Sequence, residues 1–424
     1  MAIFIFWNII SVTEMTGDVY QDFFTELSDE HLSGVTYKNL LLKKKIVRYL
    51  DHKGKTTINH ISKSLNISAP KTNALLQELI DIGLVKDYGK METGVGRKPQ
   101  LFGLISDSIY FLGVNVREHH VDVGLINFNE DLICIEKNIP YELENTESSL
   151  LRLCTLINTF IDRETAWKDK IVRIEINLSG RVNHQTGYSH NYFNFHDEPL
   201  NRIIRQKTGI TTFIENDTRA KAFGEFHLNR IKNRDNILYV NADYGIGLGV
   251  MIDNNLHYGK SGYSGEFGHI PFFNNEIICR CGKKGCLETE ASGRALVQSF
   301  REKLQSGSTS GLQHQYTLKD IKMSHIIEAA LQDDMLAIEL IGAIGAKLGK
   351  AVSTLIHLYN PELILFGGAL ASTGDHFFLP LQMSVNKYSI NLVKNDTELK
   401  LSEFGDEAGV WGSCLLAKNR LLNT

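Results

Sequence analysis

The sequence predicts an α/β protein with a separate winged helix-turn-helix domain near its N-terminus, and three observations predict this organisation. The chain has 424 residues of ordinary composition, 43% hydrophobic and 22% charged, which is enough for two or three folded units. Residues 37–100 are basic and combine three amphipathic stretches with two short strand-like runs. From Tyr110 onward, strand-like and helical stretches alternate, as in sheets covered by helices.

The net charge of −4 is divided unevenly along the chain. Residues 1–36 contain six acidic residues and no Lys or Arg, whereas residues 37–100 contain 13 Lys and Arg against 5 Asp and Glu, a net charge of +8. A basic block on an otherwise acidic chain is typical of a nucleic-acid-binding module. The composition also excludes a largely disordered chain, a collagen-like fibre and a disulfide-dense secreted scaffold.

The N-terminal segment, residues 1–36, begins with an apolar stretch from Ala2 to Val12. This stretch lacks a basic n-region and a small-residue cleavage site, and it is too short to cross a bilayer. Two interpretations stay open: a packed N-terminal segment, or a start codon placed upstream of the true one, for example at Met15. No other stretch is long and apolar enough for a membrane helix, so we expect a cytoplasmic protein with no membrane partner.

Residues 37–106 are expected to form the winged helix-turn-helix domain. Apolar residues recur at helical spacing over 38–50, and Gly54 ends this helix. Thr57 is expected to cap the second helix and Ser68 the third, in the positions where side-chain oxygens accept from free helix amides. Strand-like runs at 84–88 and 100–104 then flank a glycine-rich basic loop, which gives the order of three helices and a hairpin.

In this geometry the third helix enters the major groove of DNA by its N-terminal end. The residues that would meet phosphates or base edges there are Ser68, Lys71, Thr72 and Asn73. At the tip of the hairpin loop, Arg97 and Lys98 would reach phosphates or an adjacent minor groove. The alternative is a helical packing module whose basic face is merely solvated.

Residues 107–424 predict two α/β lobes. The expected strands are 110–116, 120–128, 131–137, 171–178, 212–215, 236–241, 247–252 and 363–366, and the expected helices include 148–163, 218–228 and 335–358. Ligands of such sheets bind at the carboxyl ends of strands. Four polar or glycine-rich places follow strands: 216–217, 245–249, 265–269 and 367–368. A glycine cluster alone is weak evidence for a ligand site, because glycines serve turns more often than ligands.

The cysteines give the sharpest local signal. Cys279, Cys281 and Cys286 lie within eight residues, with two glycines that let the chain curl, and His269 lies ten residues upstream. A Cys₃His set matches a closed structural zinc site. The alternatives are a redox pair or reduced free thiols. Zinc would fix the loop that carries His269 and Glu288, and the second ring nitrogen of His269 would stay available to orient a ligand.

Together these motifs resemble the ROK family of repressors, open reading frames and kinases, over nearly the whole chain from Tyr37. The most specific match is Gly265-Glu266-x-Gly268-His269 followed by the cysteine motif and Glu288, and 216–217 and 360–368 also match. The resemblance implies an actin-like, hexokinase-like ATPase fold with a sugar site between two lobes. It implies sugar contacts from Asn191, Asn216, Asp217, Glu266, His269 and Glu288. The winged helix is similar to that of the sugar-responsive repressor branch, with its N-acetylglucosamine and xylose repressors.

The chain departs from the family's kinases where they cradle ATP. Their Asp-x-Gly-Gly-Thr turn is replaced at residues 114–119 by Val-Asn-Val-Arg-Glu-His, so Asn115 stands for the leading acid and Glu118 adds negative charge. Their second phosphate turn is replaced by Asp243-Tyr244-Gly245. Asp217 matches the position of the kinases' general base, but no catalytic residue is expected.

We therefore expect a sugar-responsive DNA-binding regulator, a repressor of carbohydrate-utilisation genes and not an enzyme. Its partners would be operator DNA, a sugar or sugar derivative and a second copy of the chain, in a homodimer or higher homo-oligomer. One rival is an active ATP-dependent sugar kinase with a fused DNA-binding domain. The other is a sugar-binding protein whose helical module binds protein.

Overall fold

The computed structural model describes residues 34–90, 99–163, 165–228, 234–405 and 407–423. Most of the predicted N-terminal segment, together with Arg97 and Lys98, lies outside these residues. The chain divides into two compact units, each built from several stretches. The first consists of Met1–Ile176, Gly187–Ile214 and Ser413–Thr424, and the second of Asn177–Thr186 and Glu215–Gly412. The N-terminal domain therefore belongs to the same unit as the first lobe.

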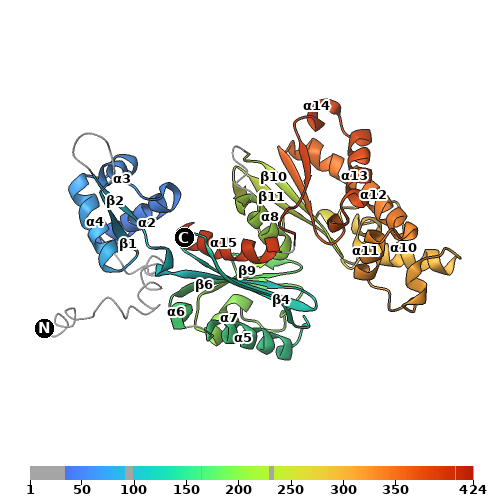
Figure 1. Ribbon diagram of the computed structural model, residues 1–424, viewed down its shortest axis with the longest axis horizontal. Helices are drawn as coiled ribbons and strands as arrows, with labels where there is room; N and C mark the ends of the chain where they lie inside the picture. Colours follow the sequence, from blue (N-terminus) through green and yellow to red (C-terminus); the bar gives the residue numbers. More distant parts are fainter. Residues whose placement is uncertain (1–33, 91–98, 164, 229–233, 406, 424) are drawn as a thin grey trace. The chain divides into compact units, whose positions relative to one another are not determined.

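The N-terminal domain has the predicted order of three helices and a hairpin (Figure 1). Its elements are α2 (Val35–Lys53), α3 (Ile58–Leu65), α4 (Ala69–Asp81), β1 (Val85–Lys90) and β2 (Gln100–Leu104), and the strands pair antiparallel. Thr57 caps α3 as expected, because its hydroxyl accepts from the backbone N–H of His60 at 3.3 Å. Ile46, Leu75 and Leu79 are fully buried, so the helices share one core.

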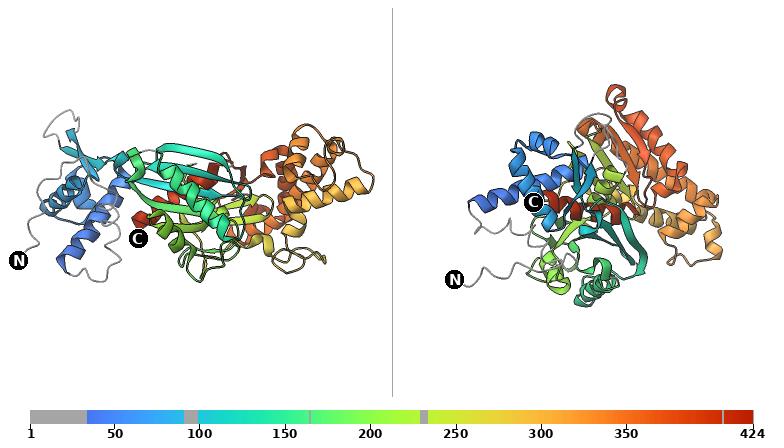
Figure 2. Two further views of the ribbon diagram at one scale, coloured as in Figure 1. Left: turned by 90° about the horizontal axis from the view of Figure 1, so that it is seen from below. Right: turned by 60° about the vertical axis from the view of Figure 1, so that its left-hand side comes forward.

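The first unit contains a five-stranded sheet in the order β5-β4-β3-β6-β9. The strands are β3 (Tyr110–Val116), β4 (His120–Asn127), β5 (Leu132–Pro140), β6 (Ile171–Leu178) and β9 (Thr212–Asn216). Its helices are α5 (Glu147–Ile161), α6 (Thr165–Lys168), α7 (Leu200–Thr208) and α15 (Glu407–Asn423). Figures 1 and 2 show α15 over one face of the sheet and α5 and α7 over the other, which explains why β3 and β6 are buried along their whole length.

The second unit contains a mixed sheet in the order β12-β11-β10-β13-β14. The strands are β10 (Ile237–Ala242), β11 (Ile246–Ile252), β12 (Asn255–Leu256), β13 (Leu363–Gly367) and β14 (Glu398–Leu401), and β10, β13 and β14 run parallel. The main helices are α8 (Asp217–Leu228), α10 (Gly293–Gln305), α11 (Met323–Leu331), α12 (Met335–Tyr359) and α13 (Asp375–Tyr388). The short helices are α9 (Glu288–Ala291) and α14 (Asn391–Lys394).

Short elements connect the sheets to the polar loops. Two-residue strands β7 (Val182–Asn183) and β8 (Tyr188–Ser189) pair with each other. The 3₁₀ turns are η2 (Ser106–Ser108), η3 (Phe267–His269), η4 (Gly311–His314) and η5 (Ala371–Thr373). Among the described residues, no helix has both the length and the apolar character that crossing a membrane requires.

The predicted α/β alternation is confirmed in both units. The strands expected at 100–104, 110–116 and 171–178 have the predicted ends, and most other elements differ by one to three residues. The helix expected at 218–228 begins one residue earlier, at Asp217. This shift places a predicted sugar-binding carboxylate in the first turn of a helix, where the helix dipole favours negative charge.

Candidate functional site

The candidate site of the second unit begins where β9 ends and α8 starts. The side-chain oxygen of Asn216 accepts from the backbone N–H groups of Thr218 and Arg219 at 3.0 and 3.1 Å. It therefore satisfies amides that the first turn of a helix leaves without partners. The amide nitrogen of Asn216 donates to Asp217 at 3.0 Å, and this pair fixes the half-buried carboxylate.

A loop that follows β6 closes over the same strand end. The hydroxyl of Ser179 donates to Asp217 at 3.1 Å, and the carbonyl of Gly180 accepts from Asn216 at 2.9 Å. The next residue, Arg181, is ion-paired through Nε with Glu266 at 3.2 Å. Each carboxylate oxygen of Asp217 thus has one partner within the described residues, which leaves acceptor capacity for a ligand hydroxyl.

Glu266 and His269 flank the turn η3. Gly265, directly before Glu266, has φ of +92°, and a Cβ there would lie 2.3 Å from the carbonyl oxygen of Leu248. Only glycine allows the backbone to come this close to β11, and this close contact positions the following residue, Glu266. The Glu266 side chain is 41% exposed, and its Oε2 lies 3.8 Å from Nε2 of His269.

The predicted metal ligands come together. The candidate ligand atoms of His269, Cys279, Cys281 and Cys286 all lie within 4.8 Å of one another. The sulfurs of Cys281 and Cys286 are 3.6 Å apart, and Nδ1 of His269 lies 3.4 Å from the sulfur of Cys279. Zn–S bonds of about 2.3 Å in a tetrahedron place two sulfurs about 3.7 Å apart, so the spacing and the soft donor set both fit zinc.

Glu288 contacts two of the four candidate metal ligands. Its Oε1 accepts from the thiol of Cys279 at 2.9 Å and lies 3.5 Å from Nδ1 of His269. Burial raises the pKa of Cys279, and the hydrogen bond to Glu288 acts in the same direction. His269 therefore presents Nδ1 to the thiols and Nε2 to Glu266, and the roles of its two nitrogens toward a metal and a ligand stay a prediction.

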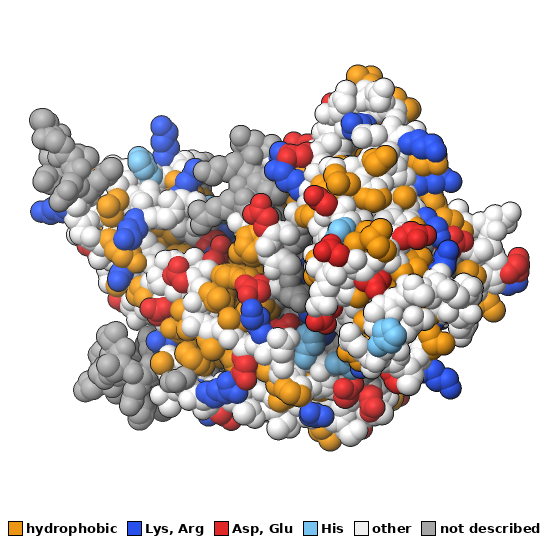
Figure 3. Space-filling view, turned by 45° about the vertical axis from the view of Figure 1, so that its right-hand side comes forward, with side chains coloured by type: hydrophobic (Ala, Val, Ile, Leu, Met, Phe, Trp, Pro, Cys, Tyr) orange, Lys and Arg blue, Asp and Glu red, His pale blue; other side chains and the backbone are white. Residues whose placement is uncertain are grey.

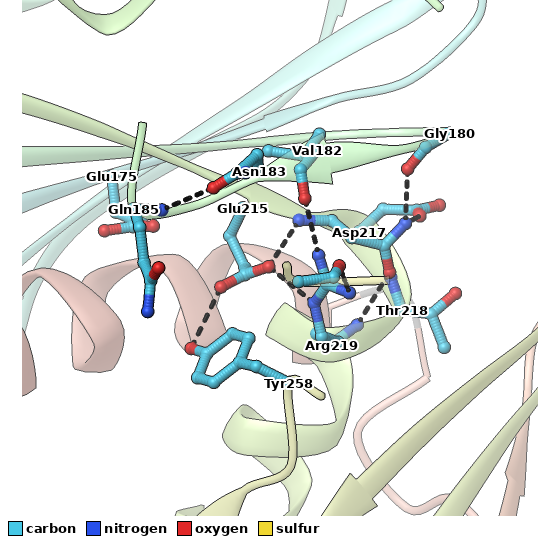
Figure 4. Close-up of polar contacts among 12 residues, drawn as sticks. Glu175, Gly180, Val182, Asn183, Gln185, Glu215, Asp217, Thr218, Arg219 and Tyr258 are labelled. Carbon is cyan, nitrogen blue, oxygen red and sulfur yellow. Dashed lines mark hydrogen bonds and ion pairs between the residues drawn. The ribbon is translucent and has the colours of Figure 1, made fainter. Parts of the chain in front are cut away.

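The structure thus brings five of the six predicted sugar-binding residues into the second unit. Asn191 is the exception: it lies in the first unit, on the exposed segment between β8 and α7, and its role stays a prediction. The sequence reasoning missed Glu215, Arg219 and Tyr258, which form a hydrogen-bonded group close to Asp217 (Figure 4). An i,i+4 pair of opposite charges at the strand-to-helix junction was the signal that could have found two of them.

The positions of the two altered phosphate turns are closed by internal contacts. In the first unit, Arg117 N–H donates to the carbonyl of His120 at 2.9 Å, and the buried Asn115 donates to Asp122 at 3.0 Å. In the second unit, the backbone N–H of Asp243 donates to the carbonyl of Gly245, and the backbone N–H of Tyr244 donates to the carboxylate of Asp243. One backbone N–H of the first turn and two of the second thus have acceptors close by in sequence.

The predicted DNA-binding surface needs one correction. Thr72 is fully buried, and its hydroxyl accepts from Ser62 at 2.9 Å and donates to the carbonyl of Ser68 at 3.1 Å. The prediction that Thr72 contacts DNA was wrong, because the β-branched side chain faces the helix core. Ser68 and Asn73 are exposed and Lys71 is half-buried at the N-terminal end of α4, so these three remain candidates.

Comparison with known proteins decides the family. The ROK family model matches residues 112–420, most of the chain, and a winged helix-turn-helix DNA-binding model matches residues 41–86. The chain belongs to the ROK family. A relative named a putative xylose repressor, from Caldicellulosiruptor sp. (strain Rt8B.4), is 28% identical over 379 residues, which cover 88% of this chain and 94% of that protein.

Solved structures of ROK proteins agree with the fold. A ROK family transcriptional regulator described as a homologue of the E. coli MLC protein matches with a TM-score of 0.75 and 26% identity, over 90% of this chain and 96% of that one. A ROK family glucokinase from Streptomyces griseus, solved with glucose and AMPPNP, has a TM-score of 0.65 and 23% identity, over 73% of this chain and 99% of that one. The expected hexokinase-like fold is thereby confirmed for the ROK part.

Proposed function

We propose that this ROK protein is a sugar-responsive transcriptional repressor. The observation that carries the proposal is the polar cluster of Asp217, Asn216 and Glu266 on a chain that also has a winged helix-turn-helix domain. The repressors named among its relatives support the same function class. A sugar bound more tightly by one conformation than by another would shift the population of the DNA-binding form.

The sugar would be held by carboxylate, amide and imidazole groups. The proposed contacts are Asn191, Asn216, Asp217, Glu266, His269 and Glu288. Such groups accept from and donate to several hydroxyls at once, and a site built this way rejects an analogue that lacks one of them. The half-buried Asp217 and the exposed Glu266 carry acceptor oxygens of the kind that sugar hydroxyls need.

The two closed turns support a sensor over a kinase. A phosphate-binding turn must offer free backbone N–H groups, whereas the N–H groups of Asp243 and Tyr244 are already bonded within their own turn. Asp243 and Glu118 would also repel a triphosphate. Asp217 still occupies the position of the family's general base, so the kinase is the rival that the experiment must test.

We propose a structural zinc ion at the cysteine cluster. His269, Cys279, Cys281 and Cys286 would hold it, and no position would remain for substrate. Zinc bound there would fix the segment between His269 and Glu288, which carries two of the proposed sugar contacts. This is a stabilising role, because the ion would order a loop that lies outside the sheets.

Operator DNA would contact the N-terminal end of α4 and the hairpin loop. The proposed residues are Ser68, Lys71 and Asn73 on the helix, with Arg97 and Lys98 at the loop. Lys71→Ala should weaken binding to every sequence and lower the salt slope by about one. Weak association that does not respond to salt would instead favour a helical module that binds protein.

A homodimer or higher homo-oligomer fits the two-fold symmetry of most operators. Helices α12, α13 and α14 and the residue before α14 expose large apolar side chains, namely Leu358, Leu379, Met383, Ile390 and Leu392. Figure 3 shows apolar side chains at the surface among both kinds of charge. Sedimentation of wild type and of Met383→Glu/Leu392→Glu tests whether a second copy covers these helices.

A ligand screen tests the proposed function directly. Thermal unfolding is followed with xylose, glucose, N-acetylglucosamine and their phosphate esters, because a ligand at 100 times its Kd stabilises by about 2.7 kcal/mol. A sugar that stabilises the protein and releases it from operator DNA supports the proposal. Transfer of phosphate from ATP to any of these sugars, lost in Asp217→Asn, would instead establish the kinase.

A further inference from the structure

We propose that Arg219 is a positioning residue of the sugar site: its buried guanidinium holds two loops together and thereby sets which sugars the site accepts. The inference rests on the proposed function and deepens it, because it concerns the selectivity of the same site. Arg219 is only 4% exposed and lies in the first turn of α8, two residues after Asp217.

The guanidinium of Arg219 makes three hydrogen bonds to three different segments (Figure 4). Nε donates to Glu215 at 2.7 Å, on the strand that leads into the site. Nη1 donates to the carbonyl of Gly262 at 2.7 Å, and Nη2 donates to the carbonyl of Val182 at 3.1 Å. The planar fork of arginine has donors in fixed directions, so these contacts fix both loops relative to α8.

The carboxylate of Glu215, the ion-pair partner of Arg219, also has several hydrogen-bond donors. Glu215 is fully buried and accepts from the backbone N–H of Asn216 at 2.8 Å and from the hydroxyl of Tyr258 at 3.0 Å, in addition to Arg219. A buried ion pair is stable only when its remaining lone pairs and protons also have partners. The pair therefore forms a rigid support directly behind Asn216 and Asp217.

The two loops that Arg219 joins also touch each other. Gly262 has φ of +81°, and a Cβ there would lie 3.3 Å from the carbonyl oxygen of Val182. The ring of Tyr258 stacks on His184 with centroids 3.7 Å apart. The first loop carries Ser179 and its neighbours, and the second leads to Glu266, so the support reaches both sides of the proposed site.

This geometry makes selectivity depend on a residue that need not touch sugar. If the loops shift relative to α8, the distance between Asp217 and Glu266 changes, and the hydroxyl pattern that both can satisfy changes with it. A polar site discriminates by leaving buried groups unpaired against the wrong ligand, and this requires fixed positions. A loose site should bind its best sugar more weakly and discriminate less.

Arg219→Lys is the decisive variant. Lysine keeps the charge beside Glu215 but lacks the fork, so it cannot serve both carbonyls in the same geometry. We expect the Kd of the best sugar of the screen to rise about tenfold or more. The pairwise ratios of the Kd values for xylose, glucose and N-acetylglucosamine should move toward one. The zinc content should stay unchanged, and so should operator binding measured in the absence of sugar.

Two further proteins separate positioning from simple destabilisation. Arg202→Lys, on the exposed surface of α7, is the matched control and should leave Kd and selectivity unchanged. In Arg219→Met/Glu215→Gln the whole ion pair is removed without leaving a buried unpaired charge, and it too should lose selectivity. All are compared by calorimetry at a temperature where each is folded.

The outcomes divide clearly. Unchanged Kd and unchanged selectivity in Arg219→Lys, with wild type binding sugar, would overturn the positioning role and leave the proposed function standing. A loss of affinity that is the same for every sugar would also overturn it, because it would indicate general weakening. If wild type binds none of the sugars, the proposed function fails and the inference fails with it.

Discussion

Polar side chains gather at two places beside buried strands of the molecule, and their surroundings differ. At the end of β9, Asp217 is half-buried and Glu266 is 41% exposed, so both can meet a ligand. In the paired strands β3 and β4, Asn115 and Asp122 lie opposite each other, are 1% and 4% exposed and bond to each other. Residue type alone does not mark a binding site; what matters is whether the polar atoms still face solvent.

The comparison also separates two kinds of support. Behind Asp217, the ion pair of Glu215 and Arg219 is buried and bonds outward to two loops. Beside Asn115, the carboxylate of Asp122 accepts from the backbone N–H of Asn138 at 2.9 Å, within the sheet itself. The first arrangement positions a surface for a partner, whereas the second only closes a hairpin.

The largest expected effect comes from replacing two of the proposed zinc ligands. Cys281→Ser/Cys286→Ser should lose zinc and several kcal/mol of stability, because a structural zinc ion contributes its binding free energy to folding. The sugar response should be lost at the same time, since His269 and Glu288 lie on the same loop. Elemental analysis and thermal unfolding measure both effects.

Cys134→Ser is the matched control, because Cys134 lies outside the cluster in β5. It should keep both zinc and sugar response. Finding no metal in the wild-type protein would reject the zinc assignment. An intact sugar response in the double variant would show that sugar binding at the end of β9 does not depend on the metal.

A smaller effect is expected at the two carboxylates compared above. Asp217→Asn should raise the Kd for sugar about 10- to 100-fold, since a hydrogen bond to a charged group is worth about 1.5–3 kcal/mol. Asp122→Asn should leave this Kd unchanged, because Asp122 is buried in the sheet. Calorimetry with the best sugar of the screen gives both values, and equal losses in the two variants would contradict the distinction between the two regions.

Restoring the kinase-type acid sharpens the same contrast. Asn115→Asp should destabilise the protein by about 1–3 kcal/mol at pH 7, because it places a second buried carboxylate about 3 Å from Asp122. One of the two carboxyls then has a raised pKa in the folded state, so the deficit should shrink as the pH falls through that pKa. Denaturant unfolding at pH 7 and pH 5 tests this; a deficit that grew toward pH 5 would contradict it.

Much of this organisation could be predicted from the sequence, for identifiable reasons. The two long buried strands β3 and β6 have predicted ends that agree with the structure: β3 appears as a nearly continuous apolar run, and β6 as an alternation of apolar and polar residues. The four candidate metal ligands are close in sequence, so their spacing already indicates that they meet at one place. The winged helix was readable because its caps and turns use Thr57 and glycine at the expected places.

The contacts made over long sequence distances could not be predicted. Arg219 meets carbonyls that lie 37 and 43 residues away, and backbone carbonyls carry no sequence signal. Thr72 was misplaced because its position on α4 was judged by its distance from the N-cap, whereas the packing against Ser62 of α3 decides which face it occupies. In both cases the missing information was the tertiary partner.

The smallest expected effect concerns Glu290 of α9, which follows the proposed zinc ligand Cys286 in the chain. Glu290 accepts from the side-chain amide of Asn275 at 2.6 Å and is ion-paired with Lys347 at 3.0 Å. Burial acts to raise its pKa, but the hydrogen bonds from Asn275 and Lys347 outweigh it, so the pKa lies below its ordinary value of 4.5. Glu290 thus binds a proton less readily in the folded than in the unfolded chain.

By linkage, the stabilisation from Glu290 is complete above pH 4.5 and is lost as the pH falls through the lowered pKa. Glu290→Gln should therefore be about 0.5–1 kcal/mol less stable than wild type at pH 7, and the difference should fade below pH 4.5. Glu302→Gln, on the exposed face of α10, is the control measured in the same series. A stability difference that stayed constant down to pH 3 would contradict this prediction. It would show that the packing of the Glu290 side chain, and not its charge, stabilises this part of the second unit.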